Sequence, residues 1–356
     1  MATGVVDAGA SLAGVTVGGS LKGGHSQSGE IRSGGAMGAV KIGGDIVGTS
    51  ELFTGNITSR GGIASATVRG SLIGGGNGTG SITATGAIGA VKIGGDIIGG
   101  SLSSPGIPAN SSGYIRGQRI GSLFVGGSIY AGVDTSNSFA VDGSGSVRAV
   151  DDIGPIIIKG SLIGSIDDDG NSSDGDFKPV VISARGVAGL GPTAKNDLAI
   201  KSIKIGGRME MAQILAGYDT ALSAKNADAQ LGPITIGGDL IASSIVAGVA
   251  KSTFYFGTGA ETKISGAGVK DNLDANGAVS KIASVVIKGS AFGTTATNDT
   301  VTFAIAAQQL GKLTIGGATL PLKSGPSNDL FFINALPLGT TRLTTNFFDF
   351  HAFEVP

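Results

Sequence analysis

The chain has 356 residues, of which 65 are glycine, and its 25 basic and 26 acidic side chains leave a formal net charge of −1. This balance gives no electrostatic footprint for nucleic acid, the absence of cysteine excludes disulfides and thiol catalysis, and no apolar run of 18 residues predicts a membrane span. Glycine far exceeds its usual share of about 7 per cent, but there is no Gly-X-Y period, and apolar residues make up 41 per cent. A collagen triple helix and a disordered linker are therefore both excluded.

A repeat of apolar residues and glycine begins near residue 12 and continues to about residue 320. Segments 38–48 and 89–99 differ at a single position, and their central isoleucines, Ile42 and Ile93, define position zero of the repeat. Large apolar residues recur five before position zero, apolar residues recur two before it, and glycine always stands two after it. Ten copies of position zero are Val17, Ile42, Val68, Ile93, Val125, Ile158, Ile205, Ile236, Ile287 and Ile315.

The spacing of the copies predicts the architecture. Successive copies lie 25, 26, 25, 32, 33, 47, 31, 51 and 28 residues apart, so we expect tight coils over 12–100 and loop-bearing coils over 101–322. Positions −2 and zero share one face of a strand, and a second short apolar anchor precedes several copies at Ile31, Ile82, Ile115 and Val147. A unit this small buries its apolar face only by stacking, which predicts an all-β parallel β-solenoid of about ten coils, right-handed by the crossover rule. A β-propeller is less compatible, because its blades need about 40–45 residues.

The glycine two after position zero is interpreted as a corner residue. The residue just before it is Arg69, Lys159 or Lys288 in three copies, whereas the second site never departs from glycine. This difference predicts a positive φ or a close backbone approach at the second site only. Replacing Gly95 should accordingly be more harmful than replacing Gly94.

Little in the sequence points to catalysis. Only two histidines are present, His25 and His351, so a Ser-His-Asp site is not expected. Parallel β-helices often act on polysaccharides, and Asp45 and Asp96, two coils apart, offer one carboxylate pair for hydrolysis. We interpret them instead as solvated turn residues and predict that the protein is not an enzyme.

An acidic segment is the one candidate metal site. Asp167, Asp169 and Asn171 follow the D-x-D-x-N spacing that places oxygen ligands around calcium, and Asp174 and Asp176 could complete the shell. The alternative is a solvated acidic loop without metal. A weaker echo of this pattern is formed by Asp271, Asp274 and Asn276.

The two ends of the chain differ in composition. Residues 323–356 include a dense group of phenylalanines and are expected to cap the last coil or to dock on another chain. This group comprises Phe331, Phe332, Phe347, Phe348, Phe350 and Phe353. Residues 1–11 offer no comparable cover, so we expect self-association through the N-terminal coil, head to tail or as a fibre.

The stretch from about 200 to 317 resembles a Gly-rich region of very large secreted bacterial repeat proteins. The resembling segments are IGGRMEMAQILAGYDT (205–220), IGGDLIASSIVAGV (236–249), VSKIASVVIKGSAFGT (279–294) and QQLGKLTIGGATL (308–320). Residues 253–262 correspond to a D-G-x-F-G-T-A-D-D loop of that group, with most of the acids replaced. The resemblance implies an exported or cell-surface location and no enzymatic activity.

Together these features predict a non-catalytic extracellular β-solenoid with a structural or adhesive role, possible self-association and a possible surface-polysaccharide partner. Calcium is the one cofactor considered. The alternative is a carbohydrate-active enzyme, a polysaccharide hydrolase or lyase, on the same fold. No basic segment followed by an apolar stretch marks a signal peptide within this numbering.

Overall fold

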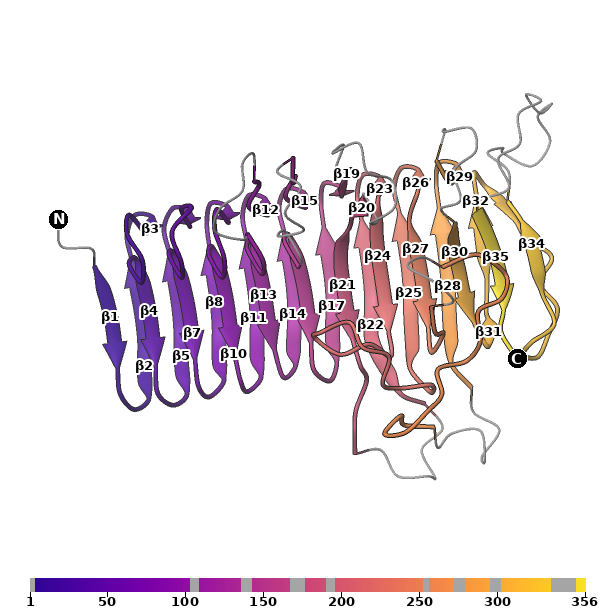
Figure 1. Ribbon diagram of the computed structural model, residues 1–356, viewed down its shortest axis with the longest axis horizontal. Helices are drawn as coiled ribbons and strands as arrows, with labels where there is room; N and C mark the ends of the chain where they lie inside the picture. The colour runs from indigo at the N-terminus through magenta and orange to yellow at the C-terminus, as the bar shows by residue number, and fades with distance from the viewer. Residues whose placement is uncertain are drawn as a thin grey trace. The chain divides into compact units, whose positions relative to one another are not determined.

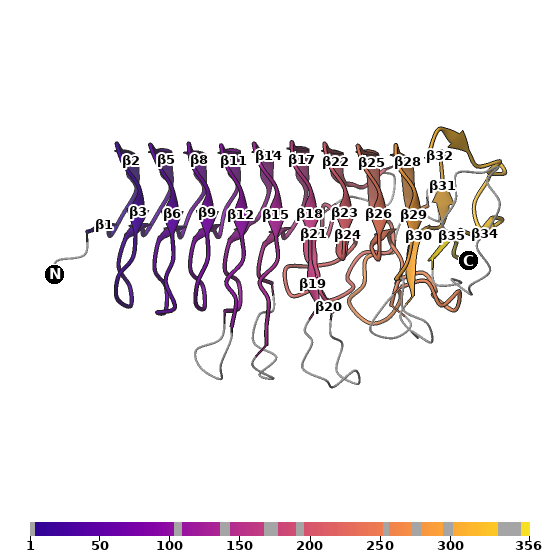
Figure 2. The same ribbon diagram turned by 90° about the horizontal axis from the view of Figure 1, so that it is seen from above.

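The structure is a computed structural model that describes residues 4–102, 109–135, 143–166, 177–189, 196–251, 256–271, 279–294, 302–333 and 350–356. Its strands wind as a parallel β-solenoid, in which successive coils place equivalent strands side by side (Figures 1 and 2). Among these residues there is no helix, and hence none that could cross a membrane. The chain divides into two compact units, residues 1–149 with 154–182 and residues 150–153 with 183–356.

Unit 1 contains three parallel sheets, here named A, B and C in the order in which a coil enters them. Sheet A consists of β1 (Val5–Ala8), β4 (Glu30–Ser33), β7 (Asn56–Ser59), β10 (Ser81–Ala84), β13 (Tyr114–Gly117) and β16 (Ser146–Ala149). Sheet B consists of β2 (Leu12–Val17), β5 (Met37–Ile42), β8 (Ile63–Val68), β11 (Ile88–Ile93), β14 (Ile120–Val125) and β17 (Ile153–Ile158). Sheet C consists of β3 (Leu21–Lys22), β6 (Ile46–Val47), β9 (Leu72–Ile73), β12 (Ile97–Ile98), β15 (Ile129–Tyr130) and β18 (Leu162–Ile163). A short antiparallel pair, β19 (Ser165–Ile166) and β20 (Phe177–Lys178), follows them.

Unit 2 repeats the arrangement with longer connections, and β21 (Val180–Ala184) lies at the boundary between the two units in the chain. Its sheet A strands are β24 (Ala212–Ala216), β27 (Ser244–Ala247), β30 (Phe303–Ala307), β35 (Phe350–Glu354) and β34 (Leu330–Phe332). Its sheet B strands are β22 (Leu198–Ile205), β25 (Gln230–Ile236), β28 (Lys281–Ile287), β31 (Gln309–Leu310), β32 (Leu313–Ile315) and β33 (Ala318–Thr319). Its sheet C strands are β23 (Met209–Glu210), β26 (Leu240–Ile241) and β29 (Ala291–Phe292).

The predicted repeat is confirmed in detail. Every one of the ten position-zero residues is the last residue of a sheet B strand. The strands pair in register, so that Val40, Ala66, Val91 and Leu123 form one column, and all four are buried. The second anchor lies in sheet A, where Ile57 of β7 occupies the same column as Ile31 and Ile82. The apolar core is therefore a set of stacked columns inside the coil.

The corner between sheets B and C is held by a ladder of side-chain hydrogen bonds. The side-chain oxygen of the residue after the recurrent glycine accepts the backbone N–H of its equivalent in the next coil. The N···O distances along this ladder are 3.0 Å for Ser20–Asp45, 2.8 Å for Asp45–Ser71, 3.0 Å for Ser71–Asp96, 2.7 Å for Asp96–Ser128 and 2.9 Å for Ser128–Ser161. Unit 2 continues the pattern from Asp239 to Ser290 at 2.8 Å. These residues are structural, rather than the simple solvated turn residues that the sequence analysis predicted.

This ladder explains the invariant glycine and corrects part of the prediction. Gly95 has no positive φ, but a Cβ on it would lie 2.3 Å from the Ser71 hydroxyl oxygen. A Cβ on Gly94 would lie 2.0 Å from the Arg69 carbonyl oxygen. Close approach therefore restricts both sites, and the expectation that it restricts only the second was wrong. In its own coil, Arg69 occupies the first site and its side chain is exposed. The first site therefore requires glycine in some coils and not in others.

The first coil supplies a matched control for these glycines. A Cβ on Gly18 or Gly19 would meet nothing within 4 Å, because no described strand precedes their coil. We expect Gly94→Ala and Gly95→Ala each to lower the free energy of unfolding by about 1–3 kcal/mol, since the added Cβ displaces packed atoms. Gly18→Ala and Gly19→Ala should change it by less than about 0.5 kcal/mol. Denaturant unfolding of the four variants checks this, and equal losses in both coils would contradict it.

In unit 1 the positive φ angles lie at a different corner, between sheets C and A, whereas in the last coil the glycines after position zero, Gly316 and Gly317, do have positive φ angles of +56° and +85°. At the corner between sheets C and A, a buried serine or threonine precedes a glycine whose φ is positive. The glycine angles are +62° at Gly29, +63° at Gly55, +56° at Gly80, +56° at Gly113 and +61° at Gly145. The preceding hydroxyls of Ser28, Thr54, Thr79, Ser112 and Ser144 each accept a backbone N–H from the start of the same connection, at 2.8–3.1 Å. We call this recurrent feature the hydroxyl–glycine corner.

The second coil, which begins with β4, carries an unfavourably buried charge. The first residue of β4, Glu30, is 4 % exposed and stacks in register with Asn56 and Ser81. Burial raises the pKa of the Glu30 carboxyl above its ordinary value, outweighing the Arg32 guanidinium 3.2 Å away, which lowers it. The folded state therefore binds this proton more tightly than the unfolded state does.

A pH prediction follows from the direction of this shift. Because the pKa of Glu30 is raised on folding, the stability that it contributes is complete below its ordinary pKa and is lost as pH rises through the folded value. We expect Glu30→Gln to remove this fall and to leave the protein at least as stable at neutral pH. The exposed Glu51 offers a control as Glu51→Gln. Thermal unfolding between pH 4 and 8 tests it, and a destabilised E30Q protein at neutral pH would contradict it.

The described part of the C-terminal segment extends sheet A of unit 2. Strand β35 pairs in parallel with β30, and β34 pairs antiparallel with β35. Phe350 and Phe353 are buried, whereas Phe332 is 59 % exposed. Phe331 lies on β34, and Phe347 and Phe348 lie outside the described residues. This end of the sheet therefore finishes with a change of strand direction.

Candidate functional site

The predicted calcium ligands do not fall in the part of the chain that the structure describes. Asp167, Asp169, Asn171, Asp174 and Asp176 all lie within residues 167–176, outside the described residues, so calcium binding there stays a prediction. Of the weaker echo, Asp274 and Asn276 are likewise outside, while Asp271 pairs with Lys263 at 2.7 Å. Elsewhere in the described ranges, no group of three acidic or histidine side chains is placed to hold a metal ion.

The carboxylate pair considered for hydrolysis is used by the corner ladder. One oxygen of Asp45 accepts the Ser71 N–H, and one oxygen of Asp96 accepts the Ser128 N–H. Each aspartate backbone N–H in turn donates to a serine of the preceding coil. Both side chains are thus held along the corner by the coil repeat itself.

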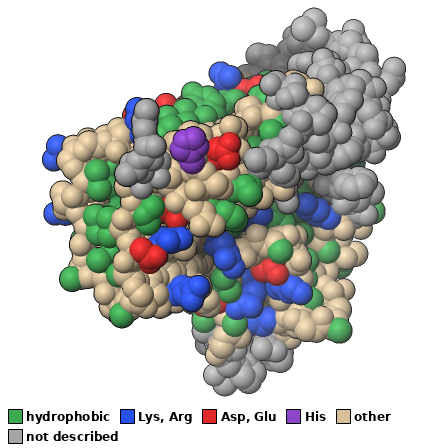
Figure 3. Space-filling view, turned by 60° about the vertical axis from the view of Figure 1, so that its left-hand side comes forward, with side chains coloured by type: hydrophobic (Ala, Val, Ile, Leu, Met, Phe, Trp, Pro, Cys, Tyr) green, Lys and Arg blue, Asp and Glu red, His purple; other side chains and the backbone are tan. Residues whose placement is uncertain are grey.

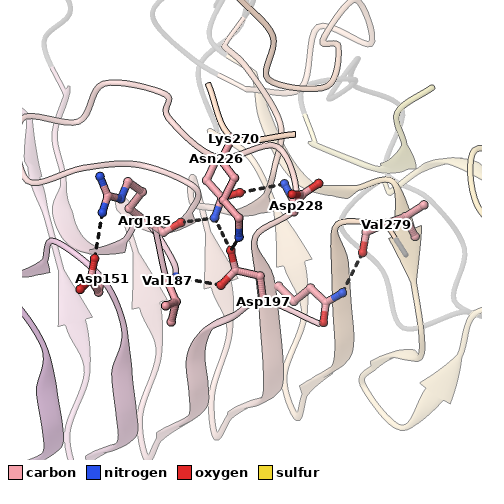
Figure 4. Close-up of polar contacts among 9 residues, drawn as sticks. Asp151, Arg185, Val187, Asp197, Asn226, Asp228, Lys270 and Val279 are labelled. Carbon is pink, nitrogen blue, oxygen red and sulfur yellow. Dashed lines mark hydrogen bonds and ion pairs between the residues drawn. The ribbon is translucent and has the colours of Figure 1, made fainter. Parts of the chain in front are cut away.

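In the described residues, a dense polar cluster lies in unit 2, where connections from sheet A to sheet B are long. Three such connections, residues 185–197, 217–229 and 248–280, leave the ends of β21, β24 and β27. They bring together side chains from distant parts of the sequence (Figure 4). We call this cluster the Asp197 network; its members are Asp151, Arg185, Asp197, Asn226 and Lys270.

Asp197 is the centre of this network and is fully buried. Its Oδ1 atom accepts the backbone N–H of Val187 at 2.8 Å, which closes the connection to which both residues belong. Its Oδ2 atom accepts the Asn226 side-chain N–H at 2.6 Å and also the Lys270 ammonium. The Lys270 side chain is only 10 % exposed. One carboxylate therefore joins all three connections.

Asn226 and Gly186 complete the packing around the carboxylate. The Asn226 Nδ2 atom also donates to the Arg185 carbonyl at 2.7 Å, and its Oδ1 atom accepts the Asp228 N–H at 3.0 Å. Gly186 has a φ of +90°, and a Cβ on it would lie 2.6 Å from the Asn226 amide nitrogen. At the edge of the network, Arg185 pairs with Asp151 at 2.9 Å.

The backbone reinforces these side-chain contacts. Lys270 donates its N–H to the Lys225 carbonyl at 2.9 Å and accepts the Ala227 N–H at 2.8 Å. The third connection is thereby fixed to the second on both sides of Asn226. Both oxygens of Asp197 accept hydrogen bonds from the connections themselves. A general acid or base would instead direct an oxygen toward a substrate, so this carboxylate is suited to holding the three connections together.

A second contact fastens another part of the third connection. The buried Tyr218 hydroxyl donates to the Val249 carbonyl at 2.7 Å, and its ring meets the buried Phe256 ring edge-on at 6.2 Å between centroids. Burial raises the pKa of the Tyr218 hydroxyl well above its usual range, so it remains a donor. These contacts pack connection 248–280 against connection 217–229.

The loop that carries Phe256 is folded around a single carboxylate. Glu261 is 4 % exposed and accepts three backbone N–H groups, from Gly257 at 2.6 Å, Thr258 at 2.9 Å and Gly259 at 2.8 Å. The Gly257 carbonyl contacts the His351 Nδ1 atom of β35. Glu261 is the one acidic residue left in the stretch 253–262, and in the described part of the loop its carboxylate binds backbone N–H groups.

Two features of this site escaped the sequence analysis. Asp197 and Lys270 are 73 residues apart, and no spacing pattern links them. The hydroxyl–glycine corner, by contrast, leaves a readable signal, because serine or threonine, glycine, any residue and an apolar residue recur at 28–31, 54–57, 79–82, 112–115 and 144–147. Aligning the copies on the apolar residue of sheet A would have revealed it.

Comparison of the chain with protein-family models, with curated proteins and with solved structures finds no match in any of the three. The function proposed below therefore depends on the geometry of the chain itself.

Proposed function

We propose that the protein is a non-catalytic extracellular solenoid with a structural or adhesive role, which holds variable loops on a regular support. The observation that carries this proposal is the hydroxyl–glycine corner. In the short turns of unit 1 the hydroxyls of Thr54 and Thr79 bond to backbone only five and four residues earlier. In the longer connections Ser112 and Ser144 make the same bond twelve residues back, to Gly100 and Gly132.

The corner therefore closes short and long connections with the same contact. Whatever the length of the insertion, the chain returns to the same positive-φ glycine and enters sheet A in register. Loops on a rigid support are where binding residues usually lie, and this support tolerates changes in their length. The Asp197 network serves the equivalent purpose for the three long connections of unit 2.

The other predictions made from the sequence belong to this proposal. A surface polysaccharide is the partner that fits an adhesive role, and export to the cell surface fits the resemblance of the stretch from about 200 to 317. Self-association through the N-terminal coil, head to tail or as a fibre, is a further part of this proposal. One oxygen each of Asp45 and Asp96, and both oxygens of Asp197, accept structural hydrogen bonds, which supports the non-catalytic role over a polysaccharide hydrolase or lyase.

Two measurements made together distinguish an adhesive protein from a polysaccharide-cleaving enzyme. The intact chain is applied to immobilised neutral and acidic polysaccharides, and bound protein and newly released reducing ends or unsaturated products are recorded together. We expect retention without product. A matched variant, in which residues 101–111 are replaced by the short turn 76–78, should keep its thermal stability and change its retention. Release of product by the parent chain would overturn the non-catalytic proposal, and unchanged retention would overturn the role of that loop.

A further inference from the structure

Arginine is distributed unevenly over unit 1. Within the residues of this unit, sheet A and its turns to sheet B contain five arginines and no lysine, whereas Lys22, Lys41 and Lys92 stand in sheets B and C. The same segments contain two acidic residues, Asp7 and Glu30. Figure 3, in which the N-terminal side of Figure 1 comes forward, shows Lys and Arg side chains gathered on the lower part of the visible face. The five arginines are Arg32, Arg60, Arg116, Arg119 and Arg148.

Three of these arginines share one column on the outer side of sheet A. The residue before each member of the column is 0 % exposed and lies in the core, so alternation along the strands directs the column outward. Parallel strands lie about 4.8 Å apart, which makes a row of five residues about 19 Å long. We call this row the arginine column; the register of the strands gives its members as Arg32, Thr58, Thr83, Arg116 and Arg148.

Arg116 and Arg60 offer exposed charge at this surface. Arg60 stands two residues after Thr58, with the buried Ser59 between them. Both arginines are exposed, and in the described residues neither is paired with an acidic side chain. Arg116 and Arg148 are register partners, and like charges on adjacent strands repel each other. An anion bound beside Arg116 would relieve that repulsion.

The N-terminal end of the column shows how one of its arginines binds a carboxylate. The Arg32 Nη2 atom lies 2.8 Å from the Oδ2 atom of Asp7, its register partner in the preceding coil. A carboxylate one coil away, in line with the column, is therefore a favourable partner for the guanidinium. The planar guanidinium matches the two oxygens of a carboxylate, whereas a lysine ammonium acts as a point charge. A surface with arginine and no lysine thus favours carboxylates.

The middle of the column adds hydroxyl groups. The Thr83 hydroxyl donates to the Thr58 hydroxyl oxygen at 3.3 Å, and both threonines are half-buried. Hydroxyls both donate and accept hydrogen bonds, as the hydroxyls of a sugar do. A single-stranded nucleic acid would instead stack its bases on exposed aromatic rings. The Tyr114 ring of this sheet is buried, 5.9 Å from the guanidinium carbon of Arg148.

We propose that the arginine column, together with Arg60, binds a carboxylate-bearing polysaccharide that lies along unit 1. The polymer places carboxylates beside Arg116 and Arg60 and hydroxyls beside Thr58 and Thr83. A linear polymer suits the surface because its binding groups stand in a row, and several weak contacts on one chain add to a stronger attachment. This inference rests on the adhesive part of the proposed function, and it names the class of polysaccharide and the surface that binds it.

Two matched double variants separate this surface from general electrostatic attraction. Arg60→Gln with Arg116→Gln removes two exposed charges from the proposed surface. Arg69→Gln with Lys159→Gln is the control, because it removes two exposed charges from the corner between sheets B and C of the same unit. Both variants have the same net charge, and thermal unfolding verifies that each keeps the stability of the parent chain.

Polygalacturonate is the probe, and its fully methyl-esterified form supplies the same sugar chain without charge. Biolayer interferometry measures binding of the intact chain and both variants to the immobilised polymers, with single-stranded DNA as a competing polyanion. We expect the parent chain to bind the acid form and not the ester. Arg60→Gln with Arg116→Gln should raise the apparent Kd about tenfold, since an exposed ion pair contributes a factor of about two to five. The control variant should change the Kd by less than about twofold.

The possible outcomes separate this inference from the proposed function. Equal binding of the acid form and the ester, equal losses in the two double variants, or displacement by single-stranded DNA at equal charge concentration would each overturn the inference. A parent chain that binds neutral polysaccharides alone would overturn it and leave the adhesive role standing. A parent chain that binds no polysaccharide would overturn the adhesive role itself, and this inference with it.

Discussion

Replacing Gly80 with alanine is expected to lower the free energy of unfolding by about 2–4 kcal/mol. Two causes add at this position. The φ of Gly80 is +56°, which a residue with a Cβ adopts only at a cost of about 1–2 kcal/mol. The new Cβ would also lie 2.1 Å from the Ile73 carbonyl oxygen, so the backbone of the corner must shift.

The matched control is Gly19→Ala. Gly19 has no positive φ and no atom within 4 Å of the added Cβ, so its replacement should change stability by less than about 0.5 kcal/mol. Denaturant unfolding followed by circular dichroism measures both variants. If the two lose the same stability, the hydroxyl–glycine corner does not depend on glycine, and the account of this corner fails.

Lys270→Met is expected to destabilise the protein by about 3–5 kcal/mol. The substitution leaves the Asp197 carboxylate fully buried beside an uncharged side chain, and a buried charge without its partner is costly. It also releases one of the three long connections of unit 2. We therefore expect faster proteolytic cleavage within residues 248–280.

An exposed ion pair provides the comparison. Arg208 and Glu210 pair with side chains that are 52 % and 24 % exposed, so Arg208→Met should cost about 0–1 kcal/mol. Combining Lys270→Met with Asp197→Asn removes the unpaired charge and should recover part of the loss. Equal losses for Lys270→Met and Arg208→Met, or no recovery in the double variant, would show that Lys270 does not hold the network through its charge.

The solenoid could be predicted because the core imposes a periodic pattern. Residues such as Ile42 and Ile93 end equivalent strands, and stacking in register requires the same kind of side chain in each column. Position zero therefore repeats ten times, and insertions between copies change only the spacing. The class of fold follows from these columns without knowledge of any loop.

The chemical role of the corners could not be read in the same way. The glycine at position 95 is invariant because of the hydroxyl of Ser71 on the coil beside it, and the sequence alone does not distinguish that cause from a positive φ. The true positive-φ glycines escaped notice because Ser28 stands 11 residues after Val17, whereas Ser112 stands 19 residues after Ile93. When the copies are aligned on position zero, these glycines therefore fall at different positions in different copies.

The Asp197 network was beyond prediction for a different reason. Its contacts join three connections of unequal length, and each connection contributes a different residue type rather than a repeated one. No periodicity marks such a cluster, since nothing requires the same side chain to recur in another coil. Only the path of the chain in space brings Lys270 to Asp197.

The alternation of serine and aspartate along the corner ladder bears on how the length of this protein can change. Segments 38–48 and 89–99 are nearly identical, and they lie 51 residues, or two complete coils, apart. Joining residue 37 directly to residue 89 would therefore remove two complete coils and leave one copy of the segment. After such a loss Ser20 would be followed by Asp96 instead of Asp45, and serine would still alternate with aspartate as far as Ser128. The solenoid can therefore be shortened or lengthened in steps of two coils while the new junction keeps the same serine–aspartate contact.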